Sequence, residues 1–264
     1  MKKYLVIGNP IEHSLSPQLH NYWIQKYNIN GIYEKKKIVD NDLKDLILKV
    51  KAKEISGINV TVPFKNKIIP YLDQLTIEAN KTQSVNTIYL KGEIVVGHNT
   101  DISGFELSIK KTKYDIKDKK ILILGAGGVV SSIIQALNNM KVSQIYVCNR
   151  TKEKAENLKK LFENLIVVNW GEIPNFDMII NATSLGLKKN DLIDLDLSNI
   201  GRDKFFYDVI YNPKQTNFLQ TAKKFGHITQ NGRMMFIYQA FAAFKIWHQI
   251  DPNVDIETIK ELKE

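Results

Sequence analysis

Short apolar runs alternate with longer amphipathic stretches along most of this chain. Runs such as Tyr4–Ile7, Ser56–Val62 and Ile121–Leu124 have the length and the β-branched content of buried strands. Asp42–Lys51 has the amphipathic pattern of a helix, and Gly232–His248 is a longer helical stretch rich in Met, Phe, Ala and Trp. Strands that alternate with helices are typical of an α/β fold with a mostly parallel sheet.

The same two patterns predict the other elements. Ser16 followed by Pro17 predicts the start of a helix that runs to about Lys26, with Ser16 as the N-cap. Lys91-Gly92 separates two runs like the turn of a hairpin. Further strands are expected at Ile32–Val39, Val85–Leu90, Glu93–Gly97, Gln144–Cys148, Leu165–Asn169, Met178–Asn181 and Phe205–Val209, and further helices at Ile102–Lys111 and Val129–Asn139.

The segment Lys119–Thr151 is expected to form one βαβ unit. Its first strand leads into Gly125-Ala126-Gly127-Gly128, and a helix and a second strand follow. Glycines at such a turn let backbone N–H groups approach a pyrophosphate at the helix N-terminus. Val130 stands where the fingerprint has Gly or Ala, so we expect slightly looser packing of helix on strand. The segment predicts a Rossmann-type dinucleotide site; the alternative for the glycines is an ordinary structural turn.

The end of the second strand bears on the choice of cofactor. An NAD site usually has Asp or Glu here, which accepts a hydrogen bond from the ribose 2′-hydroxyl, whereas an Arg accommodates a 2′-phosphate. This chain has Asn149-Arg150-Thr151, with Lys154 shortly after. The alternative is a solvated basic loop in a lysine-rich protein. We expect NADP rather than NAD.

The length of 264 residues allows one large domain or two modest ones. We place the boundary near Ile102–Lys111 and expect the C-terminal helix to return to the first domain. The expected domains are residues 1–104 together with 236–264, for the substrate and the catalysis, and residues 105–235, for the dinucleotide.

Charge and composition exclude several classes of protein. Lys+Arg 37 against Asp+Glu 28 give a net charge of +9, but the lysines are scattered and no nucleic-acid-binding motif accompanies them. We expect a solvated basic surface, with no nucleic-acid or membrane partner. Cys148 is the only cysteine, which excludes a disulfide framework, and the five histidines lack metal-ligand spacing. The apolar run at the start is too short for a signal peptide, so a cytoplasmic location is expected.

The first domain has polar residues where core strands are expected to end. They include Asn59, Thr61 and Lys65 in GINVTVPFK, Asn86 in SVNT and Asp101 in HNTD. A lysine, a carboxylate, two amides and a hydroxyl can together bind a polyhydroxylated substrate and move a proton. Each taken singly also has a structural explanation: Asp101 can be a helix N-cap, and Ser14 and Ser16 can be loop hydrogen bonders.

Together and in this order, these segments resemble the shikimate dehydrogenase family over nearly the whole chain. Departures from its pattern are Val129-Val130 and the segment Lys188–Asp203. The matching segments are Gly8-Asn9-Pro10, His13–Pro17, Asn59–Lys65, Val85–Thr87, Gly97–Asp101, Gly104-Phe105, Gly125–Gly128, Asn149–Thr151, Asn181–Gly186, Tyr207-Asp208, Tyr211–Pro213, Gly232 and Gln239-Ala240.

The resemblance implies reversible, NADPH-dependent reduction of 3-dehydroshikimate to shikimate, with Lys65 and Asp101 as the catalytic pair. It implies that the substrate carboxylate is held by Ser14, Ser16 and Tyr211, and the ring hydroxyls by Asn59, Thr61, Asn86 and Gln239. It implies that NADP is contacted by Gly125, Ala126, Gly127, Gly128, Val129, Asn149, Arg150, Thr151, Lys154, Thr183, Val209 and Gly232. A monomer or a homodimer is expected.

Three alternatives stay open at this point. One is a quinate/shikimate dehydrogenase that uses NAD, which the absence of an acidic residue at Asn149 disfavours. Another is a methylene-tetrahydrofolate dehydrogenase, which NVTVPFK followed by NTD does not suit well. The third is a non-catalytic sensor of shikimate-pathway metabolites, for which the pair Lys65 and Asp101 is not needed.

Overall fold

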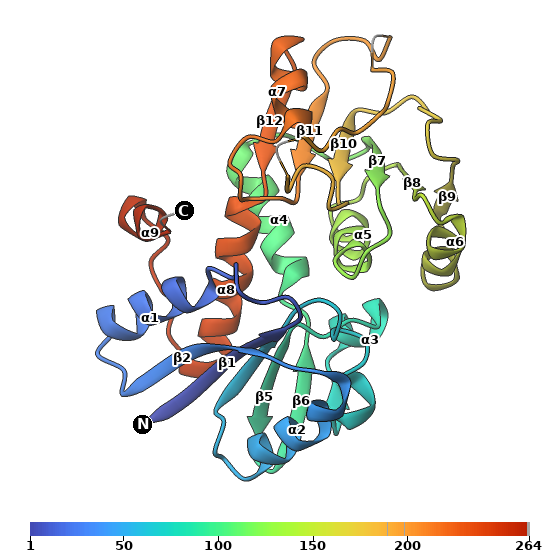
Figure 1. Ribbon diagram of the computed structural model, residues 1–264. Helices are drawn as coiled ribbons and strands as arrows, with labels where there is room; N and C mark the ends of the chain where they lie inside the picture. Colours follow the sequence, from blue (N-terminus) through green and yellow to red (C-terminus); the bar gives the residue numbers. More distant parts are fainter. Residues whose placement is uncertain (189, 198, 263–264) are drawn as a thin grey trace. The chain divides into compact units, whose positions relative to one another are not determined.

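The computed structural model describes residues 1–188, 190–197 and 199–262, which form two compact units (Figure 1). The first unit comprises Met1–Gly104 with Ile237–Glu264, and the second comprises Phe105–Phe236. The expected junctions, after residues 104 and 235, differ from these by at most one residue. Positions 189 and 198, in the segment that departs from the family pattern, and 263–264, in the expected C-terminal segment, lie outside the described residues.

The first unit is built on a mixed six-stranded sheet in the order β2-β1-β3-β5-β6-β4. β1 pairs in parallel with β2 and β3, whereas β5 pairs antiparallel with β3 and β6. The short strand β4 was not predicted, because two residues are too few for a periodic pattern. The strands are β1 (Lys2–Gly8), β2 (Gly31–Lys37), β3 (Gly57–Val60), β4 (Gln74–Leu75), β5 (Thr87–Lys91) and β6 (Ile94–His98).

One face of this sheet is covered by α2 (Leu43–Lys51). Its buried residues Leu43, Leu46, Ile47 and Val50 recur at the spacing of one helix face. They share a core with aliphatic side chains of β1, β3, β5 and β6. The unit also contains α1 (Ser16–Lys26), α3 (Ile77–Thr82), α9 (Ile256–Glu261), and the 3-10 turns η1 (Asp40–Asp42) and η2 (Ile69–Tyr71).

Aromatic side chains fill the opposite face. Tyr4 of β1 and Tyr33 of β2 are register partners and pack against Trp247, with ring centroids 5.1 and 6.1 Å away. Gly57 makes room for this indole, because a Cβ there would overlap it. The Trp247 Nε1–H donates to the carbonyl of Ile88 at 3.1 Å. These contacts hold the C-terminal part of α8 (Arg233–His248) on the first sheet.

The second unit has a fully parallel six-stranded sheet in the order β12-β11-β10-β7-β8-β9. Read from β9, this is the 3-2-1-4-5-6 order of a Rossmann fold, so the predicted α/β class is confirmed. β12 was not predicted, because its sequence ITQN is mostly polar and it lies at the edge of the sheet. The strands are β7 (Lys120–Leu124), β8 (Gln144–Cys148), β9 (Leu165–Val167), β10 (Met178–Asn181), β11 (Phe205–Asp208) and β12 (Ile228–Asn231).

Helices complete the second unit. α5 buries its apolar residues completely, with Val130, Ile133, Ile134 and Leu137 at 0 % exposure. Its position directly after β7 places its N-terminus at the carboxyl end of the central strand. The helices are α4 (Asp101–Thr112), which begins in the first unit, α5 (Val130–Asn139), α6 (Lys152–Leu161) and α7 (Asn217–Lys224).

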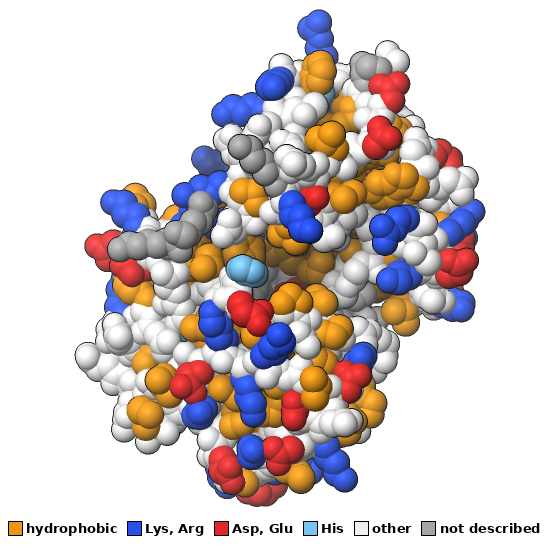
Figure 2. All heavy atoms as spheres, in the orientation of Figure 1, with side chains coloured by type: hydrophobic (Ala, Val, Ile, Leu, Met, Phe, Trp, Pro, Cys, Tyr) orange, Lys and Arg blue, Asp and Glu red, His pale blue; other side chains and the backbone are white. Residues whose placement is uncertain are grey.

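The basic residues on the drawn face of the molecule do not form one continuous patch. On the face drawn in Figure 2, lysine and arginine side chains are scattered among acidic and uncharged ones. Within the described ranges, no helix has both the length and the apolar character that crossing a bilayer requires.

Candidate functional site

The topology of the first sheet brings the proposed catalytic residues together. Asn59 of β3 is the register partner of Thr87 in β5, and Thr87 is in turn the partner of His98 in β6. The end of β3, the start of β5 and the end of β6 therefore meet at one edge of the sheet. Lys65 follows β3 and Asp101 follows β6, so both side chains reach this edge although 36 positions separate them.

Lys65 and Asp101 form a short ion pair. The Lys65 Nζ donates to Asp101 Oδ2 at 2.6 Å, and only 11 % and 8 % of the two side chains are exposed. Hydrogen bonds between charged groups are stronger than neutral ones, and burial reduces their screening by solvent. The pair combines a proton donor with a carboxylate at a site largely removed from water.

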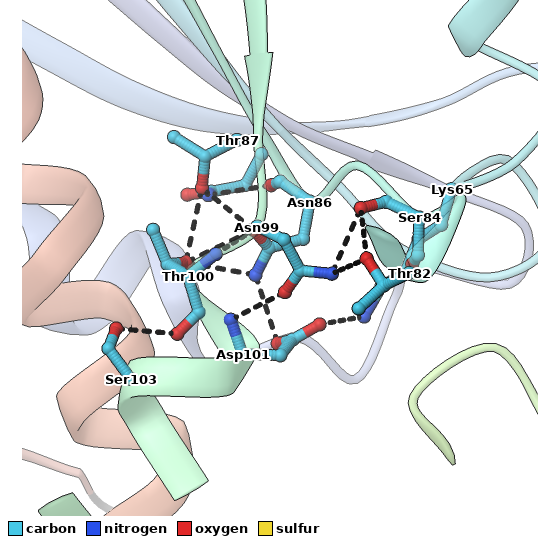
Figure 3. Close-up of polar contacts among 10 residues, drawn as sticks. Lys65, Thr82, Ser84, Asn86, Thr87, Asn99, Thr100, Asp101 and Ser103 are labelled. Atoms are coloured by element: carbon cyan, nitrogen blue, oxygen red, sulfur yellow. Dashed lines mark hydrogen bonds and ion pairs between the residues drawn. The ribbon is translucent and has the colours of Figure 1, made fainter. Parts of the chain in front are cut away.

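Asn86 holds the other carboxylate oxygen. Its Nδ2 donates to Asp101 Oδ1 at 2.9 Å, and its Oδ1 accepts from the backbone N–H of Thr100 at 2.8 Å. Because a backbone N–H can only donate, the amide oxygen must face Thr100 and the amide nitrogen must face Asp101. Figure 3 shows these contacts converging on Asp101 from the loops at the sheet edge.

Thr87, Asn99 and Thr100 also belong to this network; they lie in segments that match the family but were not predicted as site residues. Thr87 Oγ1 donates to Asn86 Oδ1 at 3.0 Å. Asn99 Oδ1 accepts from the backbone N–H of Asp101 at 3.1 Å and so fixes the start of α4. All three are buried, at 0 to 1 % exposure. Their position within SVNT and HNTD, beside the predicted residues, was the sequence feature that could have identified them.

Four of the residues predicted to bind substrate, Ser14, Ser16, Asn59 and Thr61, lie in β3 or in the segments that follow β1 and β3. Asn59 and Ser16 are each 6 % exposed, and Ser14 is half-buried. Thr61 follows β3, and its methyl group packs so closely on β1 that a Cβ on Gly8 would be 2.5 Å from it. Thr61 also donates its backbone N–H to the carbonyl of Ile7 at 2.9 Å.

The expectation that Ser16 is the N-cap of α1 was wrong. Leu15 occupies the N-cap position and no side chain caps it within the described residues, while Ser16 is the first helical residue. The Ser14 Oγ accepts the backbone N–H of Ser16, the first residue of the helix, at 3.3 Å. The Ser16 hydroxyl is therefore not used as a cap.

Two predicted substrate residues belong to different units. Gln239 is half-buried in the part of α8 that belongs to the first unit. Tyr211 follows β11 in the second unit, and its ring stacks on Phe236 with centroids 4.7 Å apart.

The glycine-rich turn fits the approach of a phosphate. Gly125 has a φ of +108°, and a Cβ there would be 2.9 Å from the carbonyl oxygen of Ala182, so only glycine is accommodated. A Cβ on Gly128 would meet nothing within 4 Å, so the turn faces open space at that point. No side chain among the described residues caps α5, whose N-cap residue is Val129. Backbone amides at such a helix start favour anions.

The end of β8 is tied to this turn. Asn149 Oδ1 accepts from the backbone N–H of Ala126 at 3.1 Å, and its Nδ2 donates to the carbonyl of Thr151 at 2.8 Å. Arg150, Thr151 and Lys154 are exposed. The Asn149 amide therefore fixes the backbone of this loop, and the cationic side chains of Arg150 and Lys154 lie on or next to it.

Thr183, Val209 and Gly232 lie in the loops after β10, β11 and β12. Thr183 Oγ1 donates to Asn181 Oδ1 at 2.7 Å. A Cβ on Gly232 would overlap the carbonyl of Val209, so the two backbones pass in direct contact. Asp208, which lies in a segment that matches the family but was not predicted as a site residue, accepts from Asn181 Nδ2 at 3.1 Å and from Thr216 Oγ1 at 2.6 Å. Burial raises the pKa of Asp208, and these hydrogen bonds oppose the rise.

Comparison with known proteins agrees with this architecture. Residues 6–88 match the family model described as shikimate dehydrogenase substrate binding domain, and residues 106–199 match the model described as shikimate / quinate 5-dehydrogenase. A shikimate dehydrogenase (NADP(+)) of Pelagibacter ubique is 59% identical over 261 residues, covering 99% of this chain and 98% of the relative.

Solved structures extend the comparison. The shikimate dehydrogenase of Aquifex aeolicus superposes with a TM-score of 0.92 at 37% identity and covers 100% of this chain and 98% of its own. The enzyme of Thermus thermophilus, in complex with NADP(H) and shikimate, gives a TM-score of 0.89 at 30% identity, with 99% and 98% covered. The chain belongs to the shikimate dehydrogenase family.

Proposed function

We propose that this chain catalyses the reversible, NADPH-dependent reduction of 3-dehydroshikimate to shikimate. The observation that carries the proposal is the buried ion pair between Lys65 Nζ and Asp101 Oδ2, at 2.6 Å. Reduction of a ketone builds negative charge on its oxygen, which needs a nearby cationic donor. In this proposal Lys65 donates the proton to that oxygen, and Asp101 holds the ammonium in place.

The proposed substrate contacts come mainly from the first unit. Ser14 and Ser16, together with Tyr211 of the second unit, hold the substrate carboxylate. The ring hydroxyls are bound by the amides and the hydroxyl of four residues, three from the strand ends of the first sheet and one from α8. These are Asn59, Thr61, Asn86 and Gln239.

The second unit holds NADP in this proposal, and the nicotinamide supplies the hydride when it is bound. The turn at Gly125–Gly128 with Val129 receives the pyrophosphate, because its backbone amides lie at the start of α5. Arg150 and Lys154 pair with the 2′-phosphate beside Asn149 and Thr151. Thr183, Val209 and Gly232 contact the rest of the cofactor.

Turnover tests the proposal directly. The purified chain is incubated with shikimate and NADP⁺, and NADPH formation is followed by absorbance, with quinate and NAD⁺ substituted in parallel. We expect activity with shikimate and NADP⁺ to exceed every other combination. Equal or faster turnover with NAD⁺ would identify a different cofactor preference, and binding of shikimate without turnover would identify a sensor.

We also propose that the chain works in the cytoplasm as a monomer or a homodimer. Its one cysteine, Cys148, is buried and free, and burial raises the pKa of its thiol to about 11, so the side chain is an inert apolar group rather than part of a disulfide framework. Light scattering on the purified protein distinguishes the monomer from the dimer.

A further inference from the structure

Tyr33 is a buried tyrosine that the proposed mechanism does not use. It lies in β2, is 1 % exposed, and donates its phenolic O–H to Asn59 Oδ1 at 2.7 Å. Burial raises the pKa of Tyr33 well above its ordinary value, and a side-chain hydrogen bond from Ser16 opposes the rise. The phenol therefore keeps its proton at working pH and remains a donor to Asn59.

The Asn59 amide can point in only one direction. Its Nδ2 donates to the carbonyl of Asn86 at 3.0 Å and to Thr87 Oγ1 at 3.1 Å. A carbonyl oxygen only accepts, so a flipped amide would place two acceptors against each other. Both N–H groups of Asn59 are then used within the protein. Its Oδ1 receives one hydrogen bond from Tyr33 and retains a second lone pair, so Asn59 can offer a ligand only an acceptor.

Tyr33 begins a directed chain of hydrogen bonds that ends at the catalytic pair. The phenol donates to Asn59, Asn59 to Thr87 at 3.1 Å, Thr87 to Asn86 at 3.0 Å, and Asn86 to Asp101 at 2.9 Å. Each donor points the same way, and such chains strengthen through mutual polarisation. Removing the Tyr33 hydroxyl therefore removes the donor to Asn59 from this series of hydrogen bonds.

The α1 helix holds Tyr33 firmly. Asn21 exchanges two hydrogen bonds with the Tyr33 backbone, at 2.8 and 2.9 Å. The His20 ring stacks on the Tyr33 ring with centroids 4.2 Å apart and an interplanar angle of 1°. Ser16 begins the same helix. Tyr33 thus has hydrogen bonds with two proposed substrate residues, Ser16 at the start of α1 and Asn59 in β3.

We propose that Tyr33 is a positioning residue: the Asn86 carbonyl sets the direction of the Asn59 amide, and the Tyr33 hydroxyl holds the Asn59 Oδ1 in place to accept from a substrate hydroxyl. The inference rests on the proposed function, and it adds a basis for specificity. A site that accepts from a hydroxyl rejects an analogue that cannot donate there, because the acceptor is left unpaired. The enzyme should therefore discriminate against a fluorine at the ring position that faces Asn59, since fluorine is small but cannot donate.

The test compares Tyr33→Phe with Tyr4→Phe. Both tyrosines are 1 % exposed and are register partners in neighbouring strands, and the Tyr4 phenol has a hydrogen bond with Ser56 rather than with a proposed substrate residue. Dissociation constants for shikimate, for NADP⁺ and for analogues with each ring hydroxyl replaced by fluorine are measured by calorimetry.

We expect Tyr33→Phe to weaken shikimate binding by about three- to tenfold, the range of one neutral hydrogen bond, and to leave NADP⁺ binding unchanged. For the wild type and Tyr4→Phe, one fluoro analogue should bind about tenfold weaker than shikimate. In Tyr33→Phe this loss of affinity on fluorine substitution should shrink to about twofold, because Asn59 Oδ1, although it still faces the same way, is no longer held at the place where it accepts from the substrate hydroxyl.

If the fluoro analogue loses as much affinity in Tyr33→Phe as in the wild type, the inference is overturned and Tyr33 has a purely structural role. The same follows if Tyr4→Phe changes the two dissociation constants as much as Tyr33→Phe does. If Tyr33→Phe does not fold, the wild type decides: full-affinity binding of every fluoro analogue contradicts the acceptor assignment. A wild type that neither binds nor turns over shikimate refutes the proposed function and this inference with it, whereas normal wild-type turnover with an undiminished loss of affinity in Tyr33→Phe refutes the inference alone.

Discussion

Replacing Lys65 by methionine tests the proposed catalytic pair most directly. The substitution keeps much of the side chain's length but removes the ammonium that lies 2.6 Å from Asp101 Oδ2. It therefore deletes the proposed proton donor without opening a large cavity. Ser14, Ser16 and Tyr211 are unchanged, so the proposed contacts with the substrate carboxylate persist.

Two separate losses are expected, one in rate and one in stability. A positioned general acid contributes about 10²–10⁴ in rate, so kcat should fall by that factor while the substrate KM changes much less. The Asp101 carboxylate, 8 % exposed, keeps the hydrogen bond from Asn86 but loses its cation. Breaking a buried ion pair costs about 3–5 kcal/mol, and the remaining donor places the loss in the free energy of unfolding toward the lower value.

The assay combines steady-state kinetics with urea unfolding, and Lys67→Met is the matched control. Lys67 Nζ pairs with Asp40 Oδ2 at 2.8 Å, but the two side chains are 48 % and 60 % exposed. Exposed pairs contribute about 0–1 kcal/mol, so this variant should retain both kcat and stability. A similar loss of kcat in both lysine variants would point to a general effect of charge removal.

The double variant decides whether the two residues act as a unit. Asp101→Asn should also lower kcat, and Lys65→Met with Asp101→Asn should be little worse than the poorer single variant. Clean additivity would make the groups independent. Near-normal kcat in Lys65→Met with only a raised KM would make Lys65 a binding residue and refute the proposed chemistry.

The remaining predictions concern the cofactor, the backbone and pH. Arg150→Ala should raise the KM for NADP⁺ by about ten- to a hundredfold and the KM for NAD⁺ far less; equal losses would mean that Arg150 only shapes the loop. Gly232→Ala should lower the free energy of unfolding by about 1–3 kcal/mol, because its Cβ would overlap the carbonyl of Val209; unchanged urea unfolding would contradict this packing. Burial lowers the pKa of His20 from 6.5 to about 3 and that of His248 to about 4. Above pH 6.5 both rings are neutral in the folded and the unfolded chain, so they cost no stability. As the pH falls below 6.5, the unfolded chain binds protons on these histidines before the folded chain does, and the free energy of unfolding falls. The free energy of unfolding, measured with urea, should therefore fall by about 2 kcal/mol from His20 alone by about pH 5. A free energy of unfolding that does not change over this pH range would contradict the lowered pKa of His20.

Local patterns in the sequence were enough for the main elements of the fold. β8 and β10 begin and end at the predicted residues, because a buried strand of a parallel sheet is a continuous apolar run bounded by polar turns. The glycines after β7 predicted a Rossmann unit, and the sheet order confirmed that class. The motif residues of the site could also be named in advance, because the segments that carry them resemble the shikimate dehydrogenase family, and the roles that this resemblance implies stay predictions.

Only the tertiary structure decided which residues surround them. β12 is a polar edge strand that exists because β11 offers it a partner, and such pairing leaves little trace in a local pattern. Ser16 does not cap α1, because the helix begins one residue earlier than expected and makes Ser16 its first helical residue. Neither outcome can be read from propensity, since each depends on what lies beside the segment.

The hydrogen-bond directions around Asp101 also needed the fold. Thr87 and Thr100 stand beside predicted residues in SVNT and HNTD, but only the pairing of β5 with β6 shows that both donate to the Asn86 Oδ1. Tyr33 is 26 positions from Asn59 and reaches it only because β2 and β3 flank β1. The orientation of a buried amide is set by which neighbours can only donate and which can only accept. Those neighbours come from distant parts of the chain, so the sequence names the amides and the fold gives them their direction.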